Sequence, residues 1–204
     1  WSTPVPIATG RSPTVAADGQ GGVHVAYRGS GGIYYLGRMA QGNWGAPMRV
    51  NTSANWQIPS LWEVCDVPEI AVGPDNVAHV LWHEIFIGAF HRARNSSGAW
   101  TTVEKVLDSL GSRDYLSGYP RAAVADDGTL HTFWPLYERG IYANRSPDGE
   151  WSDRRVLPKA RGYGDLAVDH DGFVHLAVRS LSGFARYEGT SYRFRSPTGE
   201  WSDP

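Results

Sequence analysis

The residues of this chain best suited to chemistry are aromatic and charged side chains that interrupt a repeating pattern. His83, for example, has no histidine counterpart in the other repeats, which carry Arg28, Pro135 and Arg179 there. Exposed aromatic rings stack on the C–H face of a pyranose, while arginine and carboxylate groups hydrogen-bond to its hydroxyls and acids. We therefore predict a sugar-binding site that draws on these residues: Trp56, Trp62, Glu84, Arg121, Glu138, Tyr163, Arg179 and Tyr187.

Residues that recur in every repeat are predicted to be structural instead. Four histidines follow a Pro or Gly by eleven residues, and four arginines precede a tryptophan by six: His24, His79, His131, His175; Arg38, Arg94, Arg145, Arg195. A metal-binding role would have to be filled four times, so histidines hydrogen-bonded within each unit explain this column better. The arginines and tryptophans are expected to pack between units. No metal or cofactor is predicted, since the turn at 169–172 lacks the later ligands of a calcium loop.

The period of about 50 residues indicates that one supersecondary unit recurs. Each unit divides into four short strands, A to D. Strand A is expected at 14–17, 69–72, 121–124 and 165–168, and strand B at 23–27, 78–82, 130–134 and 174–178. Strand C ends at the recurring arginine, and strand D is expected at 44–50, 100–106 and 151–157. Pairs such as Asp127-Gly128 between A and B predict tight turns with positive φ at both central residues.

This pattern resembles a large group of β-propeller repeats. Their strand B reads like His79-Val80-Leu81-Trp82, and a Tyr-x-x-Arg segment such as Tyr142 to Arg145 precedes Gly-x-Trp-Ser. Such repeats occur in sialidase-like and Asp-box-like propellers, propeller lectins and propeller polysaccharide lyases. The resemblance covers nearly the whole chain and implies an all-β, four-bladed β-propeller with four-stranded antiparallel blades. It says little about activity, because propellers host many unrelated functions.

The ends of the chain suggest how the ring closes. We expect one propeller domain over residues 1–204, with repeats at about 8–50, 51–106, 107–157 and 158–204. Residues 1–7 look like a strand D with no A, B or C before it, so this N-terminal strand is predicted to complete the last blade. Such pairing would close the ring of a monomer and remove an exposed sheet edge. An eight-bladed ring formed by two chains is the alternative.

Length differences between the repeats lie in two kinds of connection only. The A–B spacing and the stretch from arginine to tryptophan are constant, whereas the D–A and B–C connections hold the extra residues, as at 51–67 and 107–119. In an up-and-down blade these two connections emerge on the same face. Variable loops on a rigid scaffold usually carry function, so the site is predicted on this loop-bearing face.

Three functions remain open at this point. The favoured one is a secreted, lectin-like module that binds a glycan or polysaccharide. The alternative is a small polysaccharide lyase or glycosidase acting on an acidic polysaccharide. The resemblance to propeller lyases implies His83 or Tyr119 as the base and Arg121, Arg139 or Arg179 as the group that neutralises the uronate. A protein-interaction propeller without a sugar ligand is the third possibility.

The composition narrows the choice of partners. The 204 residues carry a net charge of −2 and are 41% hydrophobic, which argues against nucleic acid or an anionic membrane as partner. No apolar stretch approaches the roughly 18 residues of a membrane helix. The single cysteine excludes an internal disulfide. Because the chain starts at Trp1 without a methionine, we expect a processed protein and an extracellular location.

Overall fold

The computed structural model describes residues 3–52, 67–84, 87–108, 118–136, 139–160, 162–182 and 186–203, with backbone alone at 180–182 and 186–188. These residues form β-strands and no helix, which confirms the all-β class. It follows that none of these residues forms a helix of the length and apolarity needed to cross a membrane.

The strands form four antiparallel sheets in chain order. The first three have four strands each: β1 (Arg11–Ala17), β2 (Val23–Gly29), β3 (Gly32–Arg38) and β4 (Met48–Arg49); β5 (Glu69–Val72), β6 (Ala78–Glu84), β7 (Gly88–Arg94) and β8 (Glu104–Asp108); β9 (Arg121–Val124), β10 (Leu130–Pro135), β11 (Arg139–Arg145) and β12 (Arg155–Pro158). The fourth has three: β13 (Gly164–Val168), β14 (Val174–Ser182) and β15 (Arg186–Arg195). Strands A, B and C of the repeat are therefore confirmed.

The turns and the outer strands differ in detail from the prediction. In each A–B turn only one residue has positive φ, as at Asn76 (59°) and Gly128 (86°), so one left-handed residue suffices where two were expected. The outer strands β4, β8 and β12, which correspond to strand D, begin about four residues later than predicted. Each tryptophan makes only an isolated bridge, such as Arg145 with Trp151, and in the first three sheets the outer strand begins after it. In the first sheet Pro47, which has no N–H to donate, lies between this bridge and β4.

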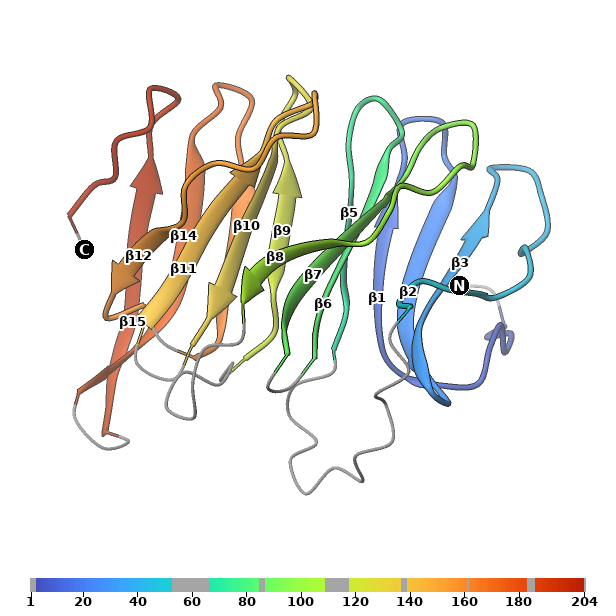
Figure 1. Ribbon diagram of the computed structural model, residues 1–204, viewed down its shortest axis with the longest axis horizontal. Helices are drawn as coiled ribbons and strands as arrows, with labels where there is room; N and C mark the ends of the chain where they lie inside the picture. The colour runs from blue at the N-terminus through green and yellow to red at the C-terminus, as the bar shows by residue number, and fades with distance from the viewer. Residues whose placement is uncertain are drawn as a thin grey trace.

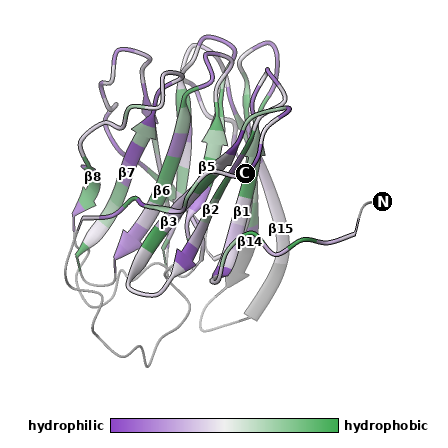
Figure 2. Cartoon of the chain, turned by 90° about the vertical axis from the view of Figure 1, so that its right-hand side faces the viewer, coloured by the Kyte–Doolittle hydropathy of each residue, from purple (hydrophilic) through white to green (hydrophobic). Residues whose placement is uncertain are grey.

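The four sheets stand side by side, with the first sheet at one end of the row and the fourth at the other (Figure 1). The first strands of the four sheets, which correspond to strand A and which we call the inner strands, are β1, β5, β9 and β13. They are neighbours in that order. Apolar clusters fill the space between successive sheets. The cluster between the second and third sheets, for example, joins Leu81 and Leu107 to Trp134 and Ile141. Hydrophobic strand segments alternate with hydrophilic turns (Figure 2).

Each junction between sheets uses a ring on strand C and an Arg–Trp pair from the next sheet. The Trp100 ring meets the Tyr35 ring edge-on, with 5.2 Å between the ring centroids, and the Trp201 ring meets the Tyr142 ring in the same way at 5.1 Å. The paired arginine, Arg94 or Arg195, lies 5.4 Å from the same tyrosine ring. The predicted packing of arginines and tryptophans between units is thus confirmed.

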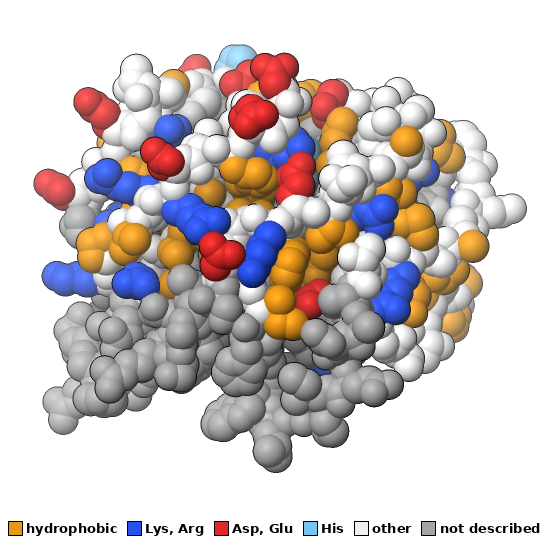
Figure 3. All heavy atoms as spheres, in the orientation of Figure 1, with side chains coloured by type: hydrophobic (Ala, Val, Ile, Leu, Met, Phe, Trp, Pro, Cys, Tyr) orange, Lys and Arg blue, Asp and Glu red, His pale blue; other side chains and the backbone are white. Residues whose placement is uncertain are grey.

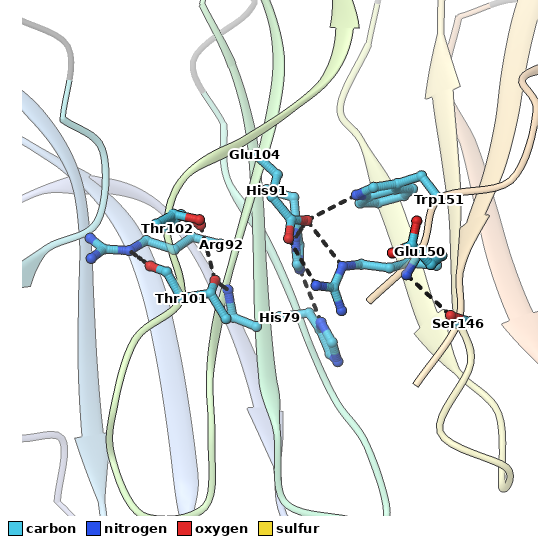
Figure 4. A network of polar contacts seen from close by, with 11 residues as sticks. His79, His91, Arg92, Thr101, Thr102, Glu104, Ser146, Glu150 and Trp151 are labelled. Atoms are coloured by element: carbon cyan, nitrogen blue, oxygen red, sulfur yellow. Dashed lines mark hydrogen bonds and ion pairs between the residues drawn. The ribbon is translucent and has the colours of Figure 1, made fainter. Parts of the chain in front are cut away.

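The middle junction varies this scheme with a carboxylate. Trp151 meets the His91 ring at 5.4 Å, and its Nε1 donates to Glu104 at 2.9 Å (Figure 4). Arg145 donates to both oxygens of Glu104, at 2.8 and 3.0 Å. His91 donates or accepts at both nitrogens, toward Glu104 and toward His79, each at 3.0 Å.

The recurring histidines are hydrogen-bonded within their own sheets, as predicted. The Nδ1 of His24, His131 and His175 contacts a tyrosine hydroxyl on strand C at 2.8, 2.6 and 2.7 Å, respectively. The turn at 169–172 is likewise occupied by its own chain. Its Asp169 carboxylate accepts from the Phe173 N–H at 2.8 Å and contacts His175 at 2.9 Å.

The predicted closure of the ring by the N-terminal strand is not confirmed. Residues 3–10 belong to no strand, Trp1 and Ser2 lie outside the described residues, and the fourth sheet has three strands. The N-terminal segment runs away from the sheets (Figure 2). The outer face of the first sheet carries an apolar cluster formed by that sheet alone: Val23, Val25, Tyr27, Tyr34, Leu36 and Trp44.

Candidate functional site

The starts of the inner strands and the ends of the B strands lie at one end of the sheets. The antiparallel register shows this directly, because Glu69, Arg121 and Asp165 at the starts of the inner strands pair with Leu81, Phe133 and Ala177, and each strand B continues beyond that pair to its own end. The D–A and B–C connections therefore leave from the same end, which we call the loop-bearing end (Figure 1).

Four different residues occupy one register position at this end. They are the residues of the inner strands that pair with the equivalent position of strand B: Thr14, Glu69, Arg121 and Asp165. We call them the inner-strand row. Most other positions of the inner strands carry small or apolar residues in every repeat. At this position the side chain is instead a hydroxyl in the first sheet, a carboxylate in the second, a guanidinium in the third and a carboxylate in the fourth. Because the inner strands are neighbours, these side chains meet one another.

Arg121 is the centre of the row. Its Nη1 lies 3.4 Å from Glu69 Oε2, and its Nε lies 3.5 Å from Asp165 Oδ1. Nε also donates to the Gly164 carbonyl at 3.0 Å, and Nη1 to the Pro120 carbonyl at 3.1 Å. The guanidinium thus faces two carboxylates and two backbone oxygens; it hydrogen-bonds to the largely buried Glu69, whereas the Asp165 carboxylate is 85% exposed at the loop-bearing end.

Glu69 is the most perturbed carboxyl group of the row. Burial raises its pKa from 4.5 to about 7, and nearby Asp165 raises it as well. Arg121 and a hydrogen bond with Thr14 lower the pKa, but they do not offset burial. Glu69 therefore exchanges its proton near neutral pH, where ordinary glutamates are ionised.

Two tyrosines extend this row toward the solvent. The Tyr119 and Tyr163 rings meet edge-on at 5.6 Å, and Arg121 lies 5.9 Å from the Tyr119 ring. Tyr163 is exposed, whereas Tyr119 is half-buried. The two chain segments approach closely at Gly118, where an added Cβ would lie 3.0 Å from the Gly162 carbonyl oxygen. Arg121, Tyr119 and Tyr163, all proposed from the sequence, are thus brought together.

Other predicted residues lie apart from this group or deeper in the sheets. His83 is 3% exposed, burial lowers its pKa to about 3, and its Nδ1 has no hydrogen-bond partner among the described residues. Glu84 is buried and accepts a hydrogen bond from Trp82 Nε1 at 3.2 Å. Arg139 begins β11, which is separated from the inner strand β9 by β10. Arg179 lies beside Tyr163, to whose carbonyl its backbone N–H donates at 2.9 Å.

The remaining predicted residues cannot be placed in the site. Trp56, Trp62 and Glu138 lie outside the described residues. Tyr187 belongs to β15, where its backbone pairs with Leu181, and its side chain is not described.

Of the inner-strand row, the predicted site included Arg121 but not Thr14, Glu69 or Asp165. A signal was present, because each of the four residues directly follows the Pro or Gly that marks strand A. The comparison of equivalent positions that singled out His83 on strand B would have found them on strand A.

The surface seen in Figure 3 mixes charges of both signs. Arginine and lysine side chains are interspersed with aspartate and glutamate over the described part of this face. Such a surface offers hydrogen-bonding groups without the one-signed field that attracts a polyanion.

Comparison with solved structures shows the same fold in proteins of other sequences. A triple arginine-to-alanine mutant of AofleA from Arthrobotrys oligospora matches with a TM-score of 0.62 at 12% identity, over 93% of this chain and 54% of that one. The leech intramolecular trans-sialidase with 2,7-anhydro-Neu5Ac matches at 0.56 and 13%, over 86% and 29%. The exo-β-1,3-galactanase from Clostridium thermocellum matches at 0.54 and 14%, over 97% and 48%.

These likenesses show a β-propeller-like fold. The chain spans about half of the length of these proteins, or less. No family model matches the sequence, and no curated protein matches it either.

Proposed function

We propose that this protein binds carbohydrate at the loop-bearing end, with the inner-strand row and the pair of tyrosines at the centre of the site. The observation that carries the proposal is the chain of contacts Glu69–Arg121–Asp165 beside the exposed ring of Tyr163. Carboxylates accept hydrogen bonds from sugar hydroxyls, and an exposed tyrosine ring covers the C–H face of a pyranose. The carbohydrate-acting names of several fold neighbours agree with this proposal.

The charge of the row favours a neutral, hydroxyl-rich glycan. Arg121 already faces two carboxylates and two carbonyl oxygens, so it holds acceptors in place rather than offering an unpaired cation to a uronate. The exposed Asp165 carboxylate would repel an acidic sugar. A binding module for neutral sugars is therefore preferred over recognition of a polyanion, in an extracellular setting where such glycans are displayed.

Glycan-array screening followed by calorimetric titration tests this proposal. We expect Tyr163→Ala and Asp165→Asn each to weaken binding at least about tenfold, because each removes a main contact of the site. Met39→Ala serves as the control, since Met39 is exposed in the C–D turn at the opposite end of the first sheet. Absence of binding to every glycan, or equal affinity of all three variants, would contradict the proposal.

A second candidate function, cleavage of a glycan, is favoured by the pKa of Glu69. A carboxyl group that holds a proton near pH 7, with Asp165 on the other side of Arg121, has the pairing that acid–base hydrolysis of a glycosidic bond requires. The lyase alternative retains Tyr119 as base, because His83 with a pKa of about 3 is a weak proton acceptor. Arg139 and Arg179 remain its proposed uronate-neutralising groups.

The two chemistries leave different products. Hydrolysis releases reducing ends, and it would be lost in Glu69→Gln. Elimination releases an unsaturated uronate that absorbs in the ultraviolet, and it would be lost in Tyr119→Phe. Binding without either product supports the lectin-like function alone.

A further inference from the structure

The two ends of the row of sheets carry complementary halves of one junction. Inside the chain, a junction forms three times between a strand-C ring, which we call the acceptor ring, and the Arg–Trp pair of the next sheet. The three acceptor rings are Tyr35, His91 and Tyr142, and their exposed fractions are 6%, 0% and 2%. The fourth sheet has the equivalent ring, Tyr192, and it is 53% exposed.

The register shows that Tyr192 is a fourth acceptor ring. In each sheet this ring pairs with one residue of strand B: Ala26 with Tyr35, Leu81 with His91, Phe133 with Tyr142 and Ala177 with Tyr192. The strand-B residue is fully buried in the first three sheets, whereas Ala177 is exposed. Tyr192 also keeps the hydrogen bond to a strand-B histidine, His175, at 2.7 Å. The fourth sheet is therefore prepared for a neighbour that the described residues do not supply.

The first sheet presents the matching Arg–Trp pair. Arg38 and Trp44 form the same isolated bridge as the other three pairs. Arg38 lies 5.6 Å over its own Trp44 ring rather than over a ring of another sheet. Behind Trp44 lies the apolar cluster of the first sheet around Val25 and Leu36. These two residues are already buried, at 8% and 0% exposed, but this is the one cluster among the described residues that joins no second sheet.

The N-terminal segment adds an independent argument. Within the chain, the segment before each inner strand is the outer strand of the neighbouring sheet, as β4 before β5 and β8 before β9. By the same rule, the segment before β1 would be the outer strand of a sheet packed against the free face of the first sheet. Ile7 follows Trp1 by six residues, as Val50 follows Trp44 and Val106 follows Trp100. Val50 and Val106 are buried, whereas Ile7 and Val5 are exposed. Beside β15, Trp201 and Ser202 already bond Arg195 and Phe194 at the end of the strand, and no described residue forms a strand along the rest of its outer edge, where such a strand would fit.

We propose that a second copy of this chain completes both ends. Its first sheet packs on the fourth sheet of its partner, so that Trp44 meets Tyr192 edge-on, Arg38 covers the same ring, and residues 3–7 add an outer strand along β15. A cation over a tyrosine ring and apolar packing between neighbouring sheets are complementary, and the chain already uses the first at two junctions and the second at all three. Head-to-tail contacts close when two copies join, which gives a ring of eight sheets.

Sedimentation velocity of the 204-residue chain over a concentration series tests this proposal. We expect a particle of twice the 22.4 kDa chain mass. Tyr192→Asp and Trp44→Ala should each weaken association at least about 30-fold, the effect of removing a central contact. Tyr192 is exposed, so its substitution leaves each chain folded, which circular dichroism would verify. Val156→Asp is the matched control, because Val156 is exposed on the outer strand of the third sheet, away from both ends.

Mixing the two variants distinguishes this head-to-tail contact from a symmetric one. A Tyr192→Asp copy still has Trp44, and a Trp44→Ala copy still has Tyr192, so the mixture retains one intact junction and should dimerise where neither variant does alone. A single-chain mass for the unmodified protein, as in a ring closed within one chain, overturns the proposal. So does a mixture that stays monomeric. Neither result depends on whether the protein binds carbohydrate.

Discussion

The pKa of Glu69 leads to a stability prediction that can be worked out from the structure. Glu69→Gln replaces a carboxyl group that burial keeps protonated up to about pH 7 with a neutral group of the same shape. In the unfolded chain the glutamate ionises near 4.5. Between these two values the folded chain holds a proton that the unfolded chain has released, so rising pH lowers the free energy of unfolding of the unmodified protein.

The magnitude follows from the shift. A displacement from 4.5 to about 7, at about 1.4 kcal/mol for each pKa unit, corresponds to about 3 kcal/mol. The glutamine variant lacks this dependence. Its free energy of unfolding, relative to that of the unmodified protein, should therefore rise by about 3 kcal/mol between about pH 4 and pH 8, while all other titrating groups cancel in the comparison.

Urea unfolding of both proteins across this pH range measures the difference. Arg121→Met is a useful second variant, because Arg121 lowers the pKa of Glu69 and its removal should extend the loss of stability to higher pH. Parallel pH profiles for Glu69→Gln and the unmodified protein would refute the reasoning, since they would mean that the folded environment does not hold the proton.

Three further substitutions probe the packing between sheets, each followed by urea unfolding near pH 7. Glu104→Gln should cost about 2–3 kcal/mol by weakening its bonds to Arg145 and Trp151. Although burial opposes ionisation of Glu104, hydrogen bonds lower its pKa, so this cost should shrink as pH falls below the ordinary glutamate range. Trp134→Ala should cost about 3–5 kcal/mol, because this fully buried ring fills the core between two sheets. Tyr142→Phe should cost about 1 kcal/mol, the worth of its 2.6 Å contact with His131.

The ends of strand A and the starts of strand B could be predicted to the residue because the turn signal between them is local, whereas β1 begins three residues earlier and β14 ends four residues later than predicted. A proline or glycine precedes strand A, and an Asp-Gly-like turn fixes where strand B begins, so β5 and β9 have the predicted bounds. Strand D was less predictable, since a tryptophan that makes only one bridge looks the same in sequence as the first residue of a strand.

The candidate site was predictable only in part, for a physical reason. Arg121, Tyr119 and Tyr163 stand out as polar or aromatic residues unique to their repeats. Comparing equivalent positions would have singled out Glu69 as a candidate, but its importance comes from burial and from neighbours 52 or more residues away along the chain, Arg121 and Thr14 among them. Such contacts depend on how the inner strands are placed side by side, which composition and local pattern do not determine.

The uniform Arg–Trp pairs have a consequence for folding errors. Every sheet offers the same two side chains to its predecessor, while the rings that receive them are interchangeable tyrosines in three cases out of four. Apart from the middle junction with His91 and Glu104, the Arg–Trp pairs therefore do not specify which sheet follows which, and the covalent linkers supply that part of the order. Refolding at high protein concentration should accordingly produce domain-swapped species, in which a sheet of one molecule packs in the place of the equivalent sheet of another. Longer linkers between sheets should make such swapping more frequent.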